Sequence, residues 1–305
     1  MGGRRGADIG RANGCALQQR RHGPVAAEIG RLAPQLNVSA ASISMKMSAL
    51  EARIGARLCQ RGRIGFRLTG EGEQVYSAAR QLFEAHTSFL AEIGNLKGHL
   101  VGKITIAMID ATVTNRAFKL QDAIRAFIGL HPNVHLTLLV LEPSAIERQL
   151  LSADVQVGIA PFYHHVPNIA YEPLFEEPHS LYCGKAHKLF SRAPDKLKRG
   201  DLNGVSYVTR GYLPAATSLY RKERPSGATV FDMEAMVHLI QSGMFIGYVP
   251  DHFAKSLIAS GELRPIRPDL FRHVSRFDVA TRKGGNAQRI VDAFMVELRA
   301  AQSRT

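Results

Sequence analysis

The chain has 305 residues, of which 45% are hydrophobic, and this is enough to bury the cores of two or three domains. A disordered tail, a collagen and a small disulfide scaffold are excluded. Lys and Arg total 39 against 26 Asp and Glu, and the formal net charge of +13 favours polyanionic partners. Residues 1–69 hold 12 Lys and Arg and 3 Asp and Glu, a net of +9, so a basic module precedes a nearly neutral body.

The cysteine and histidine positions give no sign of a disulfide framework or a metal site. Cys15, Cys59 and Cys183 lie far apart in the sequence. His164 and His165 are adjacent, so they point to different sides, and we expect surface histidines there. The chain has no apolar stretch of the length that crosses a bilayer and no apolar run of signal-peptide length near its start. We therefore expect a cytoplasmic protein with no metal, no cofactor and no membrane partner.

The basic module begins with a predicted helix-turn-helix. Apolar residues spaced four and three apart indicate helices over 25–36 and 40–54, although Pro34 interrupts the end of the first. A tight turn between them places Ser39 as the cap of the second helix. Two short helices joined in this way, on a basic segment, are typical of a helix-turn-helix. The stretch before residue 25 shows no period and is expected to be an irregular basic arm.

The segment after the second helix predicts a wing. Residues 57–68 have paired apolar stretches around glycines, as a small β-hairpin has, and they carry four arginines. Arg61, Arg63 and Arg67 would neutralise phosphates, which supplies affinity and register without reading sequence. The alternative for this segment is an ordinary solvated basic loop.

The second helix carries the side chains able to reach a DNA groove. Its serines and Lys46 are polar, while Ala40 and Met45 would contact thymine methyl groups. The alternative is a Ser-rich helix that is merely a solvated surface. The predicted DNA-binding residues are Ser39, Ala40, Ser42, Ser44, Met45, Lys46, Arg61, Arg63 and Arg67.

A long helix is predicted over 70–97, with Thr69 as its N-cap. A helix of this length would span about 42 Å, too long to pack on a small wing alone. Its apolar residues alternate four and three apart, which is typical of a coiled coil, so we expect it to pair with its copy in a second subunit. The predicted dimerisation residues are Val75, Ala79, Leu82, His86, Phe89 and Ile93.

Beyond a Gly-containing hinge at 98–102, the body alternates strands and helices. The first series has strands over 104–108, 134–140 and 155–160 and helices over 115–130 and 144–151. The second series has strands over 181–183, 205–209 and 246–250 and a helix over 232–242, and a strand over 277–280 and a helix over 288–301 close the chain. The β-α-β-α-β order predicts an α/β fold with a parallel sheet covered by helices on both faces.

The basic module is similar to a known family at specific residues. These residues are Leu-Asn-Val-Ser at 36–39, Ile43-Ser44, Leu-Glu-Ala-Arg-Ile-Gly at 50–55, Arg57-Leu58 with Arg61, and Arg-Leu-Thr-Gly-Glu-Gly at 67–72. In order and spacing they resemble the LysR-type transcriptional regulators. The body segments at 127–132, 186–189, 243–250 and 261–263 extend the resemblance from about Ile29 to nearly the whole chain.

The resemblance implies an N-terminal winged helix-turn-helix, a long linker helix that dimerises and a regulatory domain of two α/β subdomains like a periplasmic binding protein. Family members typically bind promoter DNA as tetramers, and a small molecule in the cleft of the body changes how they hold it. The implied division is an arm at 1–24, a DNA-binding domain at 25–69, a linker helix at 70–98 and a regulatory domain at 103–305, with subdomain 1 at about 103–162 and 268–305 and subdomain 2 at about 163–267.

An effector site is expected where strands of the body end. The loop from Asp110 to Thr114 follows the first strand of the body, and helix amides and Thr hydroxyls there can hold a carboxylate, although Asp110 opposes an anion. Family position adds four further residues. Among these, Arg210 pairs either with an acidic effector or with a local carboxylate. The predicted effector-binding residues are Asp110, Ala111, Thr112, Thr114, Ala160, Pro161, Arg210 and Ile246.

Two hypotheses of function follow. The first is a homodimeric or homotetrameric regulator that binds double-stranded promoter DNA and responds to a small-molecule effector. The second is a small-molecule binding protein with a degenerate DNA-binding module, because no apolar helix precedes Pro24 and Ala40, Ala41 and Met45 replace the family's Gln-Pro pair and Arg. An enzyme on the same scaffold is a third possibility, but the chain has no nucleophile elbow, phosphate loop or zinc motif, so we expect no catalysis.

Overall fold

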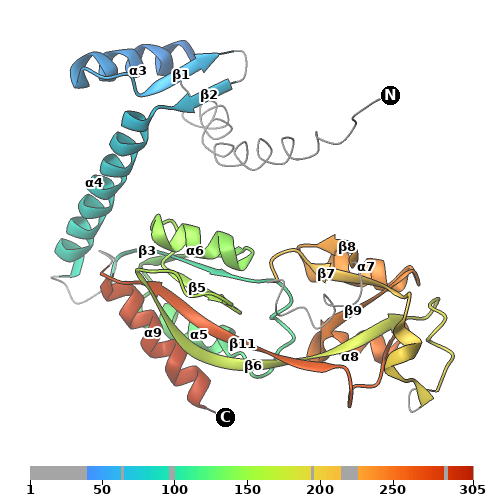
Figure 1. Cartoon of the computed structure of the whole chain (residues 1–305). Helices are drawn as coiled ribbons and strands as arrows, with labels where there is room; N and C mark the ends of the chain where they lie inside the picture. The colour runs from blue at the N-terminus through green and yellow to red at the C-terminus, as the bar shows by residue number, and fades with distance from the viewer. Residues whose placement is uncertain are drawn as a thin grey trace, which may run out of the picture. The chain divides into compact units, whose positions relative to one another are not determined.

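The computed structural model describes residues 40–62, 65–95, 100–193, 196–213, 226–284 and 288–304 (Figure 1). The chain divides into one unit that ends at His86 and a second that begins at Thr87. The arm at 1–24, the helix at 25–36 with Pro34, the cap Ser39 and the wing residue Arg63 lie outside the described residues.

The first unit contains helix α3 (Ala40–Ile54), the antiparallel strands β1 (Cys59–Gly62) and β2 (Gly65–Leu68), and the start of helix α4 (Gly70–Asn95). The predicted second helix, wing and long helix are confirmed, although α4 ends at Asn95 within the described residues. Gly55 ends α3 with a φ of 75°, a left-handed conformation that glycine adopts without strain.

Side-chain hydrogen bonds connect these elements. Glu51 Oε1 accepts hydrogen bonds from the backbone N–H groups of Leu58 (2.8 Å) and Cys59 (3.1 Å), which tie α3 to the wing and lower the pKa of Glu51. Thr69 caps α4: its Oγ1 accepts from the N–H of Gly72 (3.0 Å) and donates to the carbonyl of Arg57 (2.6 Å).

The body is built on one nine-stranded sheet in the order β4-β3-β5-β11-β6-β9-β7-β8, with β10 paired to β6. Its strands are β3 (Gly102–Met108), β4 (Val134–Val140), β5 (Val157–Ala160), β6 (Ile169–Gly184), β7 (Ser206–Arg210), β8 (Ser226–Val230), β9 (Phe245–Pro250), β10 (Leu263–Pro265) and β11 (Arg272–Arg282). The helices are α5 (Leu120–Leu130), α6 (Pro143–Leu151), η3 (Arg199–Leu202), α7 (Met233–Gln241), α8 (Asp251–Ala259) and α9 (Gln288–Ser303).

The α/β class is confirmed, whereas the expectation of a parallel sheet is wrong. Strands β3, β4 and β5 are parallel, and so are β7, β8 and β9, but β11 runs antiparallel to both β5 and β6, and β6 runs antiparallel to β9. The sheet is mixed because β6 and β11 are long strands that run back along the body. The predicted strand at 181–183 is only the end of the 16-residue β6.

The two halves of the sheet have separate hydrophobic cores. The first lobe, which we define as β3, β4 and β5 with α5, α6 and α9, encloses Phe127, Phe277 and Phe294. The second lobe, defined as β7 to β10 with α7 and α8, has a core on each face of the sheet. Leu181 and Tyr182 of β6 point into opposite cores, as successive residues of a strand do.

Strands β6 and β11 run from the first lobe into the second (Figure 1). They pair along residues 176–180 and 272–276, between the two sets of cores. This crossing segment is rich in polar and charged residues, and Glu177, Ser180 and Ser275 are buried there. A short polar belt therefore separates the cores of the two lobes.

The helix predicted at 115–130 begins only at Leu120. Asn115 Oδ1 accepts a hydrogen bond from the N–H of Ala117 (3.0 Å), which closes a local turn in place of a first helical turn. The sequence analysis also missed α8, β8 and β10.

Candidate functional sites

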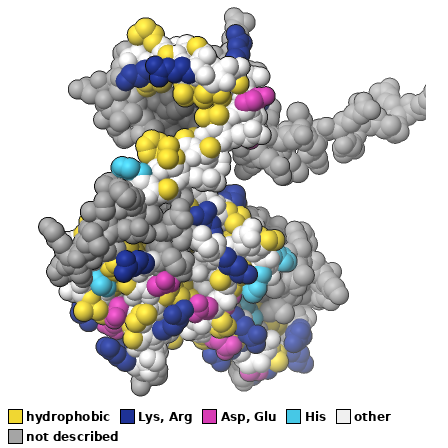
Figure 2. All heavy atoms as spheres, turned by 90° about the vertical axis from the view of Figure 1, so that its left-hand side faces the viewer, with side chains coloured by type: hydrophobic (Ala, Val, Ile, Leu, Met, Phe, Trp, Pro, Cys, Tyr) yellow, Lys and Arg dark blue, Asp and Glu magenta, His cyan; other side chains and the backbone are white. Residues whose placement is uncertain are grey.

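The candidate DNA-binding face combines α3 with the wing. Met45 is 69% exposed, and the side chains of Lys46 and Arg67 are exposed, whereas Ser42 and Ser44 are half-buried. Basic side chains form a row across this unit (Figure 2). Ser39, Arg63 and the side chains of Ala40 and Arg61 lie outside the described residues. The geometry thus leaves Met45 and Lys46 accessible, and DNA contact by this set stays a prediction.

The predicted dimerisation seam follows α4. Leu82 is 68% exposed and its neighbour Phe83 is 70% exposed, while Val75 and Ala79 are half-buried. Hydrophobic side chains gather along this helix in Figure 2. His86 is exposed as well, and the side chains of Phe89 and Ile93 lie outside the described residues. Pairing of two copies along this seam stays a prediction.

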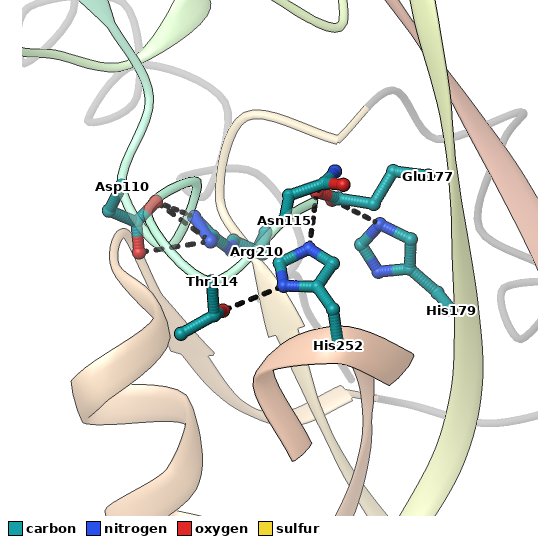
Figure 3. Close-up of polar contacts among 7 residues, drawn as sticks. All are labelled: Asp110, Thr114, Asn115, Glu177, His179, Arg210 and His252. Atoms are coloured by element: carbon teal, nitrogen blue, oxygen red, sulfur yellow. Dashed lines mark hydrogen bonds and ion pairs between the residues drawn. The ribbon is translucent and has the colours of Figure 1, made fainter. Parts of the chain in front are cut away.

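A group of polar residues lies where the lobes meet, and we call it the polar cluster (Figure 3). The first lobe contributes the loop after β3, the crossing strand β6 contributes two side chains, and the second lobe contributes the end of β7 and the start of α8. Its members are Asp110, Thr114, Asn115, Glu177, His179, Arg210 and His252.

An ion pair joins the lobes at one end of the polar cluster. Arg210 donates from Nη1 (2.7 Å) and Nη2 (2.8 Å) to Asp110 Oδ1, and Nη2 also reaches Oδ2 at 3.1 Å. The backbone N–H of Met233, the first residue of α7, donates to the same carboxylate. Burial raises the pKa of Asp110, and the guanidinium of Arg210 and the N–H of Met233 oppose that shift.

Two neighbours hold the guanidinium of Arg210 in place. The ring of Tyr212 lies 5.2 Å from the guanidinium carbon, within cation–π range, and Nη1 reaches the carbonyl of Phe231 at 3.4 Å. The Arg210 side chain is only 7% exposed. Of the two alternatives that the sequence left open, the structure therefore places a local carboxylate on Arg210.

A buried carboxylate forms the other end of the polar cluster. Glu177 accepts from His252 Nε2 at 2.8 Å, His179 Nε2 at 2.9 Å and Asn115 Nδ2 at 3.2 Å. Burial alone would raise the pKa of Glu177, but the hydrogen bonds and charges of His179 and His252 lower it to about 2. The other ring nitrogen of His252, Nδ1, forms a hydrogen bond with the hydroxyl of Thr114, 2.8 Å away.

His273 of β11 extends the polar cluster into the second lobe. Its ring stacks on His179 at 4.7 Å between centroids and meets Tyr248 edge-on at 4.8 Å. Burial and the neighbouring His179 lower the pKa of His273 to about 4. Its Nδ1 has no hydrogen-bond partner among the residues that the structure describes.

The structure brings three of the predicted effector residues, Asp110, Thr114 and Arg210, into the polar cluster. Of the others, Ala111 and Thr112 belong to the same loop, and Ala111 has a left-handed φ of 60°. The remaining three are buried residues, which lie on β5, directly after it and on β9: Ala160, Pro161 and Ile246. The Ile246 side chain belongs to a core of the second lobe, so contact of these three with an effector stays a prediction.

Four members of the polar cluster were not predicted from the sequence as site residues: Asn115, Glu177, His179 and His252. Glu177 lies in a strand that the sequence did not predict over its full length, and His252 lies in the missed helix α8. Partners 75 residues apart, such as Glu177 and His252, have no local spacing to signal them.

Two family models match the chain, and together they define a class of regulator that joins a helix-turn-helix to a ligand-binding body. "Bacterial regulatory helix-turn-helix protein, lysR family" matches residues 28–73, and "LysR substrate binding domain" matches residues 97–303. The chain belongs to the LysR family of bacterial transcriptional regulators.

Individual relatives support this assignment. The chain is 36% identical over 261 residues to the HTH-type transcriptional activator BauR of Pseudomonas aeruginosa. The aligned region covers 85% of this chain and 86% of BauR. Its fold is similar to that of full-length CbnR in complex with target DNA, with a TM-score of 0.61, 22% identity and coverage of 91% and 96%. It is also similar to the effector-binding domain of QuiR in complex with shikimate, with a TM-score of 0.56, 18% identity and coverage of 67% and 99%.

Neither a membrane-spanning helix nor a metal-binding group is found among the described residues. None of the described helices combines the length and apolar character needed to span a bilayer. Within the same ranges, no three His, Cys, Asp or Glu side chains converge to hold a metal ion.

Proposed function

We propose that this LysR-type regulator acts in the cytoplasm without catalysing a reaction. It binds double-stranded promoter DNA through α3 and the wing as a homodimer or homotetramer. A small molecule bound at the polar cluster changes how the protein binds this DNA. The observation that carries the proposal is the presence of a regulatory helix-turn-helix and a substrate-binding-type body in one chain. The absence of catalysis is inferred from relatives that are named transcriptional regulators. The domain boundaries predicted from the sequence are part of the proposal.

On the DNA side, α3 enters the major groove and the wing follows the phosphate backbone. Met45 is suited to thymine methyl groups and Lys46 to phosphate or base edges, because both are exposed on α3. Arg67 contributes charge from the wing. Leu82 and the rest of the α4 seam pair two such units, which doubles the number of phosphate contacts.

On the effector side, the ligand site is formed by the polar cluster, because it joins groups from both lobes. A ligand changes the arrangement of two lobes only by binding one arrangement better than the other, and a site made from both lobes meets that condition. QuiR was solved with shikimate, and LysG of Corynebacterium glutamicum was solved with the effector Arg. These examples support a small polar effector for this chain.

The alternative of a degenerate DNA-binding module is not favoured. The helix-turn-helix model matches residues 28–73, and α3, the wing and the Thr69 cap are all formed. The replacements at Ala40, Ala41 and Met45 alter which bases are read, and phosphate contacts by Lys46 and Arg67 do not depend on them.

A mobility-shift titration of the full-length protein on its own upstream DNA tests the proposal. We expect retention that weakens steeply with salt, and we expect Arg67→Ala to reduce the slope of log affinity against log salt by about 0.9, as loss of one phosphate contact does. Arg299→Ala is the matched control, because Arg299 forms an exposed ion pair with Glu172 in the body. Absence of retention, or retention indifferent to salt, would contradict the proposal.

A further inference from the structure

The carboxylate of Asp110 occupies an anion site that the second lobe provides. Arg210 at the end of β7 and the N–H of Met233 at the start of α7 both donate to it, whereas Asp110 itself belongs to the first lobe. The nine-residue helix α7 favours an anion at this end through its dipole. The Arg210 side chain is 7% exposed, so this anion site is buried and already occupied by the chain's own carboxylate.

Any ligand that enters here has to replace the contact between Asp110 and Arg210. A monocarboxylate would take Arg210 and leave the carboxylate of Asp110 without its guanidinium partner. An amine would take Asp110 and leave a buried guanidinium unpaired. Each result is unfavourable, because the buried Arg210 or the partly buried Asp110 would keep its charge without the partner that offsets the cost of burial.

A ligand with both charges avoids this loss. Its carboxylate replaces Asp110 on Arg210 and the N–H of Met233, and its ammonium replaces Arg210 on Asp110. The buried Arg210 and the partly buried Asp110 both keep a charged partner, and both lobes remain connected through the ligand.

The other nearby carboxylates are already engaged. Glu177 accepts hydrogen bonds from Asn115, His179 and His252, and Asp232 accepts one from the N–H of Ala235 at 2.7 Å. Asp110 would therefore be the group in the polar cluster that is released to receive an ammonium when a carboxylate takes its place.

We propose that the effector is a short amino acid with one ammonium and one carboxylate group, bound between Asp110 on the first lobe and Arg210 with the Met233 N–H on the second. This inference rests on the proposed function, since it names the ligand class of the same site. Without ligand, Asp110 and Arg210 satisfy each other's charges. The amino acid replaces this one ion pair by two, one with each of the two residues.

Calorimetric titration of the full-length protein tests the ligand class. The probes are glycine, 3-aminopropanoate, 4-aminobutanoate and 5-aminopentanoate, with propanoate, butanoate, propylamine, butylamine and succinate as partners that lack one of the two charges. We expect at least one amino acid to bind at least about tenfold more tightly than its matched carboxylate and its matched amine. The carboxylate and the amine each lack one charged group and so lose one charge-assisted contact. Equal binding of a matched carboxylate, preferred binding of succinate, or no binding of any amino acid overturns the inference.

Variants test the residues. Asp110→Asn should abolish the preference for the amino acid over its matched carboxylate and should strengthen binding of that carboxylate, because Arg210 loses its internal anion. Arg210→Gln should remove binding of both. Arg299→Gln, in the exposed pair with Glu172, is the control and should bind as the unaltered protein does. An unchanged preference in Asp110→Asn overturns the inference.

Circular dichroism checks the fold of each variant. If Asp110→Asn unfolds, the double variant Asp110→Asn with Arg210→Gln replaces the ion pair by two neutral amides and should fold without binding either class; binding by the folded double variant overturns the inference. A mobility shift on the same preparations separates the two proposals. Retained DNA binding that none of the amino acids alters overturns the inference alone, whereas lost DNA binding in the unaltered protein overturns the proposed function.

Discussion

Replacing Glu177 by glutamine tests whether the polar cluster stabilises the body. The Glu177 side chain is only 4% exposed and accepts three hydrogen bonds. Its pKa of about 2, against an ordinary 4.5, corresponds to about 3 kcal/mol of stabilisation of the charged form. Removing one partner of a buried ionic network costs about 3–5 kcal/mol, and Gln keeps one acceptor oxygen. We therefore expect the free energy of unfolding of the body to fall by about 3 kcal/mol.

The assay is urea unfolding at pH 7, followed by tyrosine emission. The chain has no tryptophan, and seven of its eight tyrosines lie in the body, so this signal reports on the body. Glu172→Gln is the matched control. Glu172 forms an ion pair with Arg299 in which both side chains are about half exposed, and such pairs contribute about 1 kcal/mol or less. Equal losses in the two variants, or a loss below about 1 kcal/mol for Glu177→Gln, would refute the reasoning.

Three further predictions concern other parts of the chain. The folded protein keeps His273 neutral down to about pH 4, whereas an unfolded chain protonates it near 6.5, so the free energy of unfolding should be highest above pH 6.5 and fall by up to about 3 kcal/mol as the pH drops to 4. His273→Phe should weaken this pH dependence when stability is measured by urea unfolding between pH 4 and 7. An unchanged pH dependence would exclude this ring as its source. Leu82→Glu should lower the mass of the oligomer in sedimentation velocity, because Leu82 is 68% exposed on the proposed seam. Ser77→Glu, on the opposite side of α4, is the control and should leave that mass unchanged. Equal effects of the two substitutions would argue against the seam. Gly72→Ala should destabilise the first unit by about 1–3 kcal/mol in thermal unfolding, because the added Cβ would lie 1.9 Å from the carbonyl oxygen of Leu58. Gly70→Ala is the control and should be neutral, because the Cβ added there meets no described atom within 4 Å. Tolerance of both substitutions would show that the contact at Gly72 relaxes.

The elements of the first unit were predictable because local rules determine them. The bounds of α3 follow from apolar spacing and from Gly55, whose left-handed conformation stops the helix. Thr69 begins α4 through a hydrogen bond to a residue three positions later, and a contact of that range is visible in sequence. The wing follows from paired apolar stretches around glycines. These signals act within a few residues, so no knowledge of the tertiary fold was needed.

The mixed sheet was not predictable in the same way. The β-α-β order correctly placed β3, β4 and β5 in parallel, but the direction of β6 and β11 depends on pairing between residues about 100 apart in the chain, such as Ile169 with Arg282. Part of β6 also lacks the alternation that identifies a strand, because its crossing segment holds Glu176, Glu177 and His179 between two cores. A strand that leaves one core and enters another carries no single hydrophobic pattern.

The same property explains why four of the seven members of the polar cluster were not predicted from the sequence. Asp110 lies just after β3 and Arg210 is the last residue of β7, positions where α/β sheets commonly bind ligands, so general rules and the family resemblance pointed to them. Glu177 and His252 bond to each other, and His252 also bonds to Thr114, so each residue is informative only once the others are in place. A buried charge with distant partners is a property of the assembled fold.

The two ends of the polar cluster differ in how a ligand affects their contacts between the lobes. Glu177 lies on the strand that both lobes share, and its hydrogen bonds reach Asn115 in the first lobe and His252 in the second, so this network maintains the crossing whether or not a ligand is present. Asp110 and Arg210 lie on separate elements and meet only because the lobes approach each other. A ligand that replaces this second contact changes the separation of the lobes while the first keeps them in register. The regulation that we propose depends on exchanging one ion pair, so variants of Asp110 should alter the response to an effector while variants of Glu177 should alter stability.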